Sequence, residues 1–293
     1  MTGMTISTKD ISELRARTGA GIGDCKKALE EAGGDMAKTG ELLRAKGIAK
    51  AEKRAGRSAS QGLIGIEILG NGAAGGMVEL DCETDFVART EEYHAVLNAM
   101  TSFVAASAPL GVTEVGAEGA FLTTAYAGST VDEAVKATSA KTGEAVQLRR
   151  IARFAPANGV VGHYLHHNEQ VGTLVEIEGA TGEAALALAK DLALHVASAD
   201  PLAVAASDID KELLERERRI AEEQVAAEGK PENVRAKIVE GKLKKFVAER
   251  TLLEQPFVKD DSKTVGDLVK EVSGKLGEVV TVRRFARFQV GAA

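Results

Sequence analysis

The chain repeats a large part of its own sequence, and this internal duplication constrains the fold more than any other feature. Residues 129–154 and 263–288 are identical at 14 of 26 positions, at an offset of 134 residues. Upstream, segments 62–81 and 159–178 match at an offset of 97, so the second copy carries 37 additional residues. We therefore expect two related halves, with an insertion in the second.

Each half is predicted to be an α+β unit, in which helices pack on a small antiparallel sheet. Alternating apolar residues indicate strands, and apolar stripes at helical spacing indicate helices. In half one, residues 61–156, we expect strands at 62–69, 76–82 and 145–155, a turn at Asn71-Gly72, and helices at 85–107 and 129–140. In half two, residues 157–293, we expect strands near 159–167, 171–178 and 278–289 and a helix near 182–198.

Residues 1–47 are predicted to form a small domain of three short helices, of the kind used to dock on a partner. Breaks at Gly19-Ala20-Gly21 and Gly33-Gly34 separate the helices, and Gly47 is expected to end the third. Residues 48–60 form a basic helical extension or linker, which is either a solvated charged surface or a contact for RNA or an acidic protein. Its charges include Lys50, Lys53, Arg54 and Arg57.

The insertion, at about residues 207–250, has the pattern of two helices joined at Gly229-Lys230-Pro231. Its first arm, 208–228, has a net charge of −4, and its second arm, 229–250, has a net charge of +4. Opposite charges on two arms joined by a turn predict an antiparallel helical hairpin, or coiled coil. Either the hairpin folds onto its own half, or it protrudes and pairs with another protein or a second copy.

Composition argues against several classes of function. Lys and Arg total 37 against 43 Asp and Glu, so the net charge of −6 does not favour a chain dominated by nucleic-acid binding. Cys25 and Cys82 match no metal or redox spacing, which indicates reduced thiols. The sequence has no apolar run of membrane-spanning length and no secretory leader, so we expect a cytoplasmic protein without a membrane partner.

The motifs of enzymes and nucleotide-binding proteins are absent or out of context. Gly70-Asn71-Gly72-Ala73-Ala74-Gly75 has the spacing of a dinucleotide-binding loop, but it joins two strands and opens no helix, so we interpret it as a hairpin turn. The sequence contains no phosphate-binding P-loop motif, so direct nucleotide binding is not expected. We expect no cofactor, no metal and no catalytic step by this chain.

Two other sets of polar residues are interpreted without assigning them a catalytic or metal-binding role. His163, His166 and His167 cluster on one predicted strand, where alternation places His166 on the opposite face from the other two. They therefore do not converge on a metal, and serve the fold or contact a partner. Arg149-Arg150 and Arg283-Arg284 recur in both copies, which favours a role in the fold.

The copies differ where the first half has Thr84-Asp85-Phe86-Val87-Ala88 and the second has Thr181-Gly182-Glu183-Ala184-Ala185. In one interpretation, Thr84 or Asp85 caps a helix and Phe86 packs into the core. In the other, the aromatic and the carboxylate make a contact outside the fold. Because the second copy lacks the Asp-Phe pair, the two interpretations are equally favoured.

The segment 84–88, after the strand that ends at Cys82, resembles a motif of the bacterial translation elongation factor Ts family. Residues 14–29 resemble a second motif of that family, and the resemblance extends along the whole chain to Gln255-Pro256-Phe257 and the last repeat. It implies a ubiquitin-associated-type helical domain at 1–47, a duplicated core and a helical hairpin insert. It also implies guanine nucleotide exchange: the family binds the GDP form of the GTPase elongation factor Tu, speeds GDP release and leaves once GTP has bound.

The resemblance implies roles for individual residues as well. Asp85 and Phe86 would enter the GTPase domain near its magnesium and phosphate site. Ile22-Gly23 stands where family members often have two bulky apolar residues, so a weaker contact is expected there. The other positions expected to meet or support the partner are Thr84, Val87, Ala88, Arg15, Lys26, Arg54 and His166.

Two alternatives from other classes stay open. One is an RNA- or ribosome-associated protein that uses linker residues 50–57, and the other is a scaffold that dimerises through 207–250. With elongation factor Tu as partner, the helical insert could also support a homodimer or a 2:2 assembly.

Overall fold

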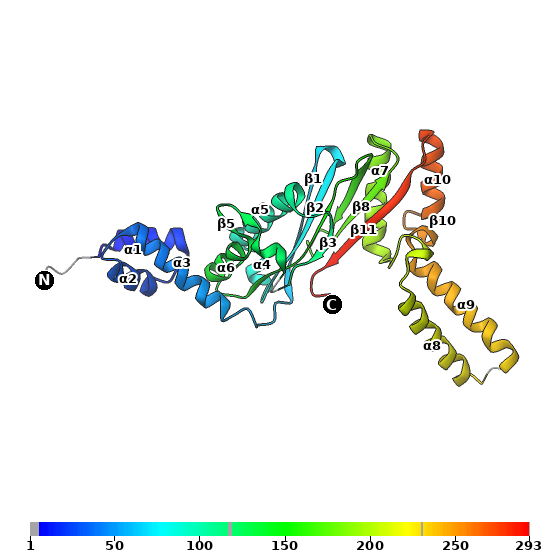
Figure 1. Cartoon of the computed structure of the whole chain (residues 1–293), viewed down its shortest axis with the longest axis horizontal. Coiled ribbons are helices and arrows are strands. Elements are labelled where there is room, and N and C mark those ends of the chain that lie inside the picture. Colours follow the sequence, from blue (N-terminus) through cyan, green and yellow to red (C-terminus); the bar gives the residue numbers. More distant parts are fainter. Residues whose placement is uncertain (1–5, 117–118, 230, 293) are drawn as a thin grey trace.

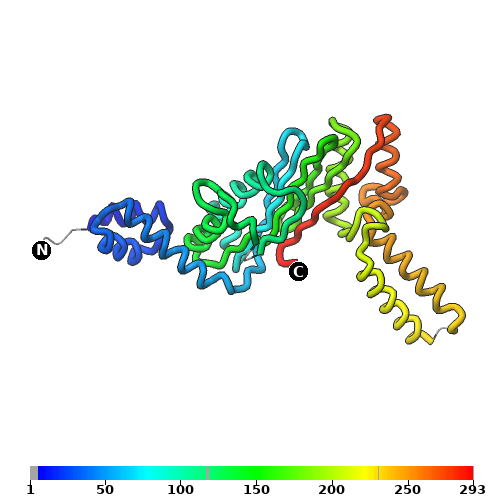
Figure 2. Tube along the Cα trace, in the orientation of Figure 1, coloured from blue at the N-terminus to red at the C-terminus, as the bar shows by residue number. Residues whose placement is uncertain are grey.

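The computed structural model describes residues 6–116, 119–229 and 231–292, so Lys230 of the predicted hairpin turn lies outside the described residues. The molecule is elongated (Figure 1): a helical domain lies at one end, two sheets with their helices occupy the middle, and a helical hairpin projects near the other end. The Cα trace in Figure 2 shows the C-terminal end of the chain returning to the middle of the molecule. The predicted α+β class is confirmed.

The N-terminal domain has the three predicted helices. Ser7 and Asp35 accept hydrogen bonds from backbone N–H groups at the start of the first and third helices. The third helix does not end at Gly47 as predicted. It continues to Glu52, so the first part of segment 48–60 is the helical extension rather than a linker, because Gly47 packs against another helix and Ala51 is buried. The helices are α1 (Thr8–Thr18), α2 (Ile22–Glu31) and α3 (Met36–Glu52).

The first half forms a four-stranded antiparallel sheet with helices packed on it. The strand at one edge of this sheet, β3, was not predicted, because it is only four residues long. The predicted helix 85–107 is interrupted, because Thr90 caps a new helix after one turn, and the predicted helix 129–140 starts after its N-cap Thr130. The elements are β1 (Gln61–Leu69), η1 (Gly70–Gly72), β2 (Ala74–Cys82), α4 (Asp85–Ala88), α5 (Glu91–Ser107), β3 (Gly111–Glu114), η2 (Ala120–Thr123), β4 (Ala125–Tyr126), β5 (Ser129–Thr130), α6 (Val131–Thr142) and β6 (Val146–Phe154), and the sheet order is β1-β2-β6-β3.

The second half repeats this arrangement with a three-stranded sheet. After its long helix the chain enters the hairpin, so within the described residues β3 has no counterpart there. The strand expected near 159–167 ends at Leu165, because the next residues turn, and the strand expected near 278–289 begins at Thr281. The elements are β7 (Gly159–Leu165), β8 (Val171–Glu178), α7 (Glu183–Ala199), η3 (Ala206–Asp208), η4 (Leu252–Glu254), β9 (Pro256–Phe257), β10 (Asp260–Thr264), α10 (Val265–Leu276) and β11 (Thr281–Gln289), and the sheet order is β11-β8-β7.

The insertion forms a helical hairpin of α8 (Lys211–Ala227) and α9 (Glu232–Arg250), as predicted. The chain enters and leaves this hairpin at one place. There the N–H group of Leu202 donates to the carbonyl of Arg250 at 2.8 Å, and an isolated β-bridge joins the residues that follow each of them. The buried inner residues of the hairpin are Ala221, Val225 and Val239.

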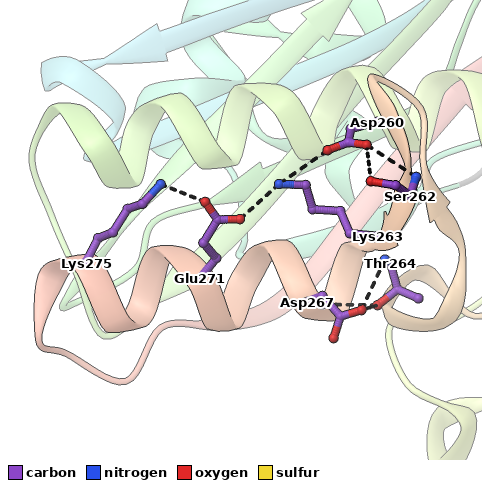
Figure 3. A network of polar contacts seen from close by, with 7 residues as sticks. All are labelled: Asp260, Ser262, Lys263, Thr264, Asp267, Glu271 and Lys275. Atoms are coloured by element: carbon purple, nitrogen blue, oxygen red, sulfur yellow. Dashed lines mark hydrogen bonds and ion pairs between the residues drawn. The ribbon is translucent and has the colours of Figure 1, made fainter.

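A polar network on the surface fixes the start of α10 (Figure 3). The N–H group of Asp267 donates to Thr264 Oγ1 at 3.1 Å, and the Asp267 carboxylate accepts in return from Thr264. Lys275 and Lys263 both donate to Glu271, at 2.7 and 2.9 Å, and their hydrogen bonds lower the pKa of that carboxyl to about 2. A threonine also caps α6 at the matching position, so both copies begin this helix in the same way.

The two sheets pack face to face around a shared apolar core, and reciprocal arginine contacts join them. Arg150 of β6 pairs with the buried Glu79 of its own sheet, and its guanidinium lies 4.5 Å from the ring centroid of Phe288 in the other sheet. In the second copy, Arg284 pairs with Glu176 of its own sheet, and its guanidinium lies over the ring of Phe154 in the first sheet. The structural role predicted for the repeated arginines is therefore confirmed for these two.

Two glycines at matching positions allow the sheets to approach each other. A Cβ atom at Gly75 would lie 2.8 Å from Val161 Cγ1, and a Cβ atom at Gly172 would lie 2.6 Å from Ile64 Cγ2. Carbon atoms of folded proteins do not approach so closely, so any side chain here would separate the sheets. The duplication therefore preserves these glycines for a packing reason.

One carboxyl group in this region is buried without a hydrogen bond. Asp81 of β2 is 1% exposed, and among the described residues neither of its carboxylate oxygens has a hydrogen-bond partner. Burial raises its pKa to about 7, and the neighbouring carboxylate of Glu79 adds to the effect while Arg149 and Arg150 oppose it. The folded chain therefore binds this proton more tightly than the unfolded chain does.

We expect stability to fall as pH rises from about 4 to about 7, because the raised pKa of Asp81 favours folding only while the group is protonated. This contribution is complete below about pH 4 and lost above about pH 7, and amounts to about 4 kcal/mol. Asp81→Asn should remove it. Thermal unfolding between pH 4 and 8 compares the chain with this variant and with the exposed-site control Asp261→Asn; parallel curves for all three would contradict the prediction.

Candidate partner-binding site

The segment 84–88, hereafter the Asp-Phe turn, is a single helical turn that presents its aromatic side chain to solvent. Thr84 is its N-cap, and its hydroxyl oxygen accepts from the N–H group of Val87 at 3.4 Å. Ala88 is buried and Val87 packs against the first-half core, but Phe86 is 81% exposed. The cap agrees with the first interpretation of this segment, whereas the packing of Phe86 into the core does not occur.

The carboxylate of the Asp-Phe turn is also on the surface. Asp85 pairs with Arg89 at 2.8 Å, four residues further on, and both side chains are exposed. An exposed pair of this kind contributes about 0.3–0.5 kcal/mol to stability, so it is easily exchanged for another partner. The turn therefore displays an aromatic ring, a carboxylate and a guanidinium together.

Two carboxylates, those of Glu144 and Glu83, hold the start of the Asp-Phe turn through hydrogen bonds. We call these hydrogen bonds the carboxylate clamp. Glu144 accepts from the N–H group of Thr84 at 3.0 Å and from its hydroxyl at 2.6 Å. In the reverse direction, the N–H group of Ala145 donates to Glu83 at 2.7 Å, and Arg57 donates to the same carboxylate at 3.2 Å. These bonds, chiefly that from Ala145, lower the pKa of Glu83. The sequence shows Gly143-Glu144 repeated at 277–278, but nothing in it pairs Glu144 with Thr84.

The helical domain is attached to the first half through α3 and α6. Gly47 of α3 lies so close to α6 that an added Cβ would be 3.0 Å from Ala140 Cβ. Ion pairs flank this contact, including one of 2.9 Å between Arg44 and Glu133. Arg54, a predicted partner residue, donates to the Ser139 carbonyl near the end of α6 at 3.1 Å, so its guanidinium is used at least in part within the chain.

A groove of about 630 Å³ separates the helical domain from the Asp-Phe turn. Arg15 lines it from α1 and Val87 from α4, so the structure brings these two predicted residues together. The predicted residues of α2 lie elsewhere on the domain and are exposed. They are Ile22, which is 59% exposed, Gly23 and Lys26.

His166 lies in the turn between β7 and β8 of the second half. Its Nδ1 atom is 2.9 Å from the hydroxyl of Tyr164. Its ring centroid is 4.3 Å from that of His167, so the opposite faces predicted for these two histidines are not observed, because strand alternation ends at Leu165. The carboxylate of Glu169 in this turn is 3.7 Å from His94, in the first turn of α5. The His166 turn therefore lies against the helix that follows the Asp-Phe turn.

The described residues contain no group of three His, Cys, Asp or Glu side chains placed to hold a metal ion. In the same part of the chain, no helix is both long and apolar enough to cross a membrane. What the site does present is an exposed aromatic ring beside charges on a fixed turn, an arrangement suited to contact with another protein.

Comparison with known proteins shows to which family the chain is similar. A family model described as elongation factor TS matches residues 83–292, a span that begins one residue before the Asp-Phe turn. The chain is 41% identical to elongation factor Ts of Prosthecochloris aestuarii and 42% identical to that of Aquifex aeolicus, over 98% of this chain and 99% of each relative. It is 43% identical to elongation factor Ts of Thioalkalivibrio sulfidiphilus, over 98% of this chain and 93% of the relative.

The chain belongs to the elongation factor Ts family. It is therefore a factor of translation elongation in protein biosynthesis. The helical domain precedes the span of the elongation factor Ts model, but the full-length relatives align with it as well. Both the domain and the Asp-Phe turn thus belong to the shared architecture.

Replacing Gly47 by Val should detach the helical domain from α6 while the two sheets stay folded, because the sheet core does not include this contact. We expect a larger radius of gyration by small-angle X-ray scattering and about tenfold faster proteolysis in the segment 53–60. Gly40→Val, on the same helix but with no atom within 4 Å of an added Cβ, is the control. Equal scattering and cleavage for both variants would show that the close approach does not hold the domain.

Proposed function

We propose that this chain promotes the release of GDP from the GTPase elongation factor Tu, as a guanine nucleotide exchange factor and not as an enzyme. The observation that carries the proposal is Phe86, an aromatic side chain 81% exposed on a fixed turn beside the carboxylate of Asp85. Buried aromatic anchors supply most of the binding energy at protein interfaces. The family of the chain supports the choice of partner.

Exchange of this kind needs no covalent step. If a protein weakens the binding of GDP to its partner by some factor, GDP weakens the binding of that protein by the same factor. The exchange factor therefore stabilises the nucleotide-free partner, and GTP that enters the emptied site displaces it for the same reason. Only differential binding to two states of the partner is required.

The two exposed residues of the turn have different tasks in this proposal. Phe86 inserts between elements of the GTPase domain and moves the backbone that surrounds the phosphates. Asp85 places a carboxylate near the bound Mg²⁺ and phosphates, which disfavours their arrangement. Loss of Mg²⁺ removes a large local charge that holds GDP. Before contact, Asp85 is paired with the exposed Arg89.

The other surfaces supply docking in this proposal. Arg15 and Lys26 offer cations on the helical domain, and Ile22 offers an exposed apolar side chain beside the open Gly23. His166 supports the contact from the second half. These residues hold elongation factor Tu while the Asp-Phe turn enters it, in the cytoplasm where translation takes place.

The Asp85→Ala/Phe86→Ala double variant should lose most of the acceleration of GDP release, by about 30-fold, because it removes both exposed side chains of the turn. Stopped-flow release of fluorescent GDP from purified elongation factor Tu measures the rate. The matched control is Val279→Ala, because Val279 lies in the second half and is also 81% exposed. Its rate should equal that of the unaltered chain.

Phe86→Ala alone should lower the maximal release rate more than it weakens association, because insertion acts on the partner after docking. Titration of the release rate against exchange-factor concentration separates the two effects. Equal losses would assign Phe86 to the docking surface alone. Absence of any acceleration by the unaltered chain would refute the proposed function.

A further inference from the structure

We propose that Glu144 is a positioning residue for nucleotide exchange, which holds the Asp-Phe turn in the conformation and direction that exchange requires. This inference rests on the proposed function and deepens it. The helix of this turn, α4, is only four residues long, and so short a helix is not stable by itself in water. Its first residue, Thr84, is fixed by two hydrogen bonds to the Glu144 carboxylate, at 2.6 and 3.0 Å.

The geometry of these bonds sets the orientation of the turn. The hydroxyl of Thr84 donates to Glu144, which leaves an oxygen lone pair to accept from the N–H group of Val87. The N–H group of Thr84 donates to the other carboxylate oxygen. Both the cap and the chain direction at the start of the turn are therefore set by one carboxylate, and both bonds are charge-assisted.

The second copy of the repeat provides an internal comparison. Thr181 and Glu278 match Thr84 and Glu144 in sequence, but both are exposed, and within the described residues no hydrogen bond joins them. Ala180 stands where the first copy has Glu83, so the reverse bond to the backbone is also lost. The clamp therefore occurs in the copy that carries the Asp-Phe pair. The matching threonine and glutamate alone are therefore not sufficient for the clamp, which accompanies the Asp-Phe pair.

The clamp also connects the turn to the helical domain. Gly143, in the left-handed conformation with φ 80°, ends α6 and directs Glu144 toward the turn. The hydroxyl of Ser139 donates to the Glu144 carbonyl at 2.5 Å, and Arg54, two residues after the end of α3, donates to the Ser139 carbonyl at 3.1 Å. These bonds connect the segment that directly follows the helical domain to the residue that holds Thr84, and so they help to fix the domain relative to the Asp-Phe turn.

The test compares Glu144→Ala and the isosteric Glu144→Gln with Glu278→Ala, the same residue in the other copy. With elongation factor Tu at fixed concentration, stopped-flow GDP release gives the maximal rate and the half-saturating concentration of each variant. We expect Glu144→Ala to lower the maximal rate about tenfold with the half-saturating concentration changed less than about twofold. Glu144→Gln should lie between, because an amide has one acceptor oxygen, and Glu278→Ala should match the unaltered chain.

Two further measurements separate positioning from general destabilisation. In a Phe86→Ala background, Glu144→Ala should lower the rate further by less than about twofold, because residues that act as a unit are not additive. Amide hydrogen exchange of residues 84–88 should become faster in Glu144→Ala and stay unchanged in Glu278→Ala. Additive loss, or equal loss of rate and affinity with a lower melting temperature, would overturn the inference.

The outcomes also distinguish this inference from the proposed function. If the unaltered chain accelerates GDP release and Glu144→Ala accelerates it equally, the positioning role is wrong and the proposed function stands. If the unaltered chain fails to accelerate release, the proposed function fails, and with it the role of Glu144 in exchange. Amide exchange then still decides whether Glu144 holds the turn.

Discussion

The face-to-face packing of the two sheets is the constraint on which the rest of the structure depends. Each sheet contributes an arginine that is neutralised by a glutamate of its own sheet and stacked on a phenylalanine of the other. Stacked guanidinium groups bring two buried carboxylates into an apolar interface without leaving either unpaired. Gly75 and Gly172 allow the approach, because neither adds a side chain between the sheets. The duplication is therefore a structural requirement, since each half completes the core of the other.

The proposed partner-binding site lies where the two copies stop being equivalent. Both copies follow a central strand with a threonine, but only the first continues with an aromatic and a carboxylate and holds that threonine with Glu144. The helical domain packs on α6, immediately before the same glutamate. The contacts proposed for the Asp-Phe turn and the helical domain therefore lie on the side of the first half, whereas the second half supplies the contact proposed for His166 and carries the helical hairpin.

The sequence was sufficient for features that depend on periodicity and repetition, and insufficient for those decided by contacts between distant residues. The strands, the helical domain, the hairpin and the structural arginines follow from pattern and from the repeat. Local pattern could not decide whether Phe86 is buried; the first-half core, already occupied by Val87, Ala88 and Tyr93, decides it. Gly47 has the appearance of a helix end, but its contact with α6 overrides that signal. The role of Glu144 could not be predicted from local pattern, because it binds Thr84, which lies 60 residues earlier in the chain.

The helical hairpin has a closed base, where the segments that lead into and out of it lie side by side. Because the N–H group of Leu202 donates to the carbonyl of Arg250, the chain leaves the second half and returns to it at neighbouring points. Beyond this base, the buried residues of α8 and α9 form a cluster of their own, so a shorter connection could replace the two helices while the sheet, α7 and α10 keep their contacts. The hairpin can therefore lengthen, shorten or acquire new contact surfaces as an independent accessory, under selection separate from that on the Asp-Phe turn.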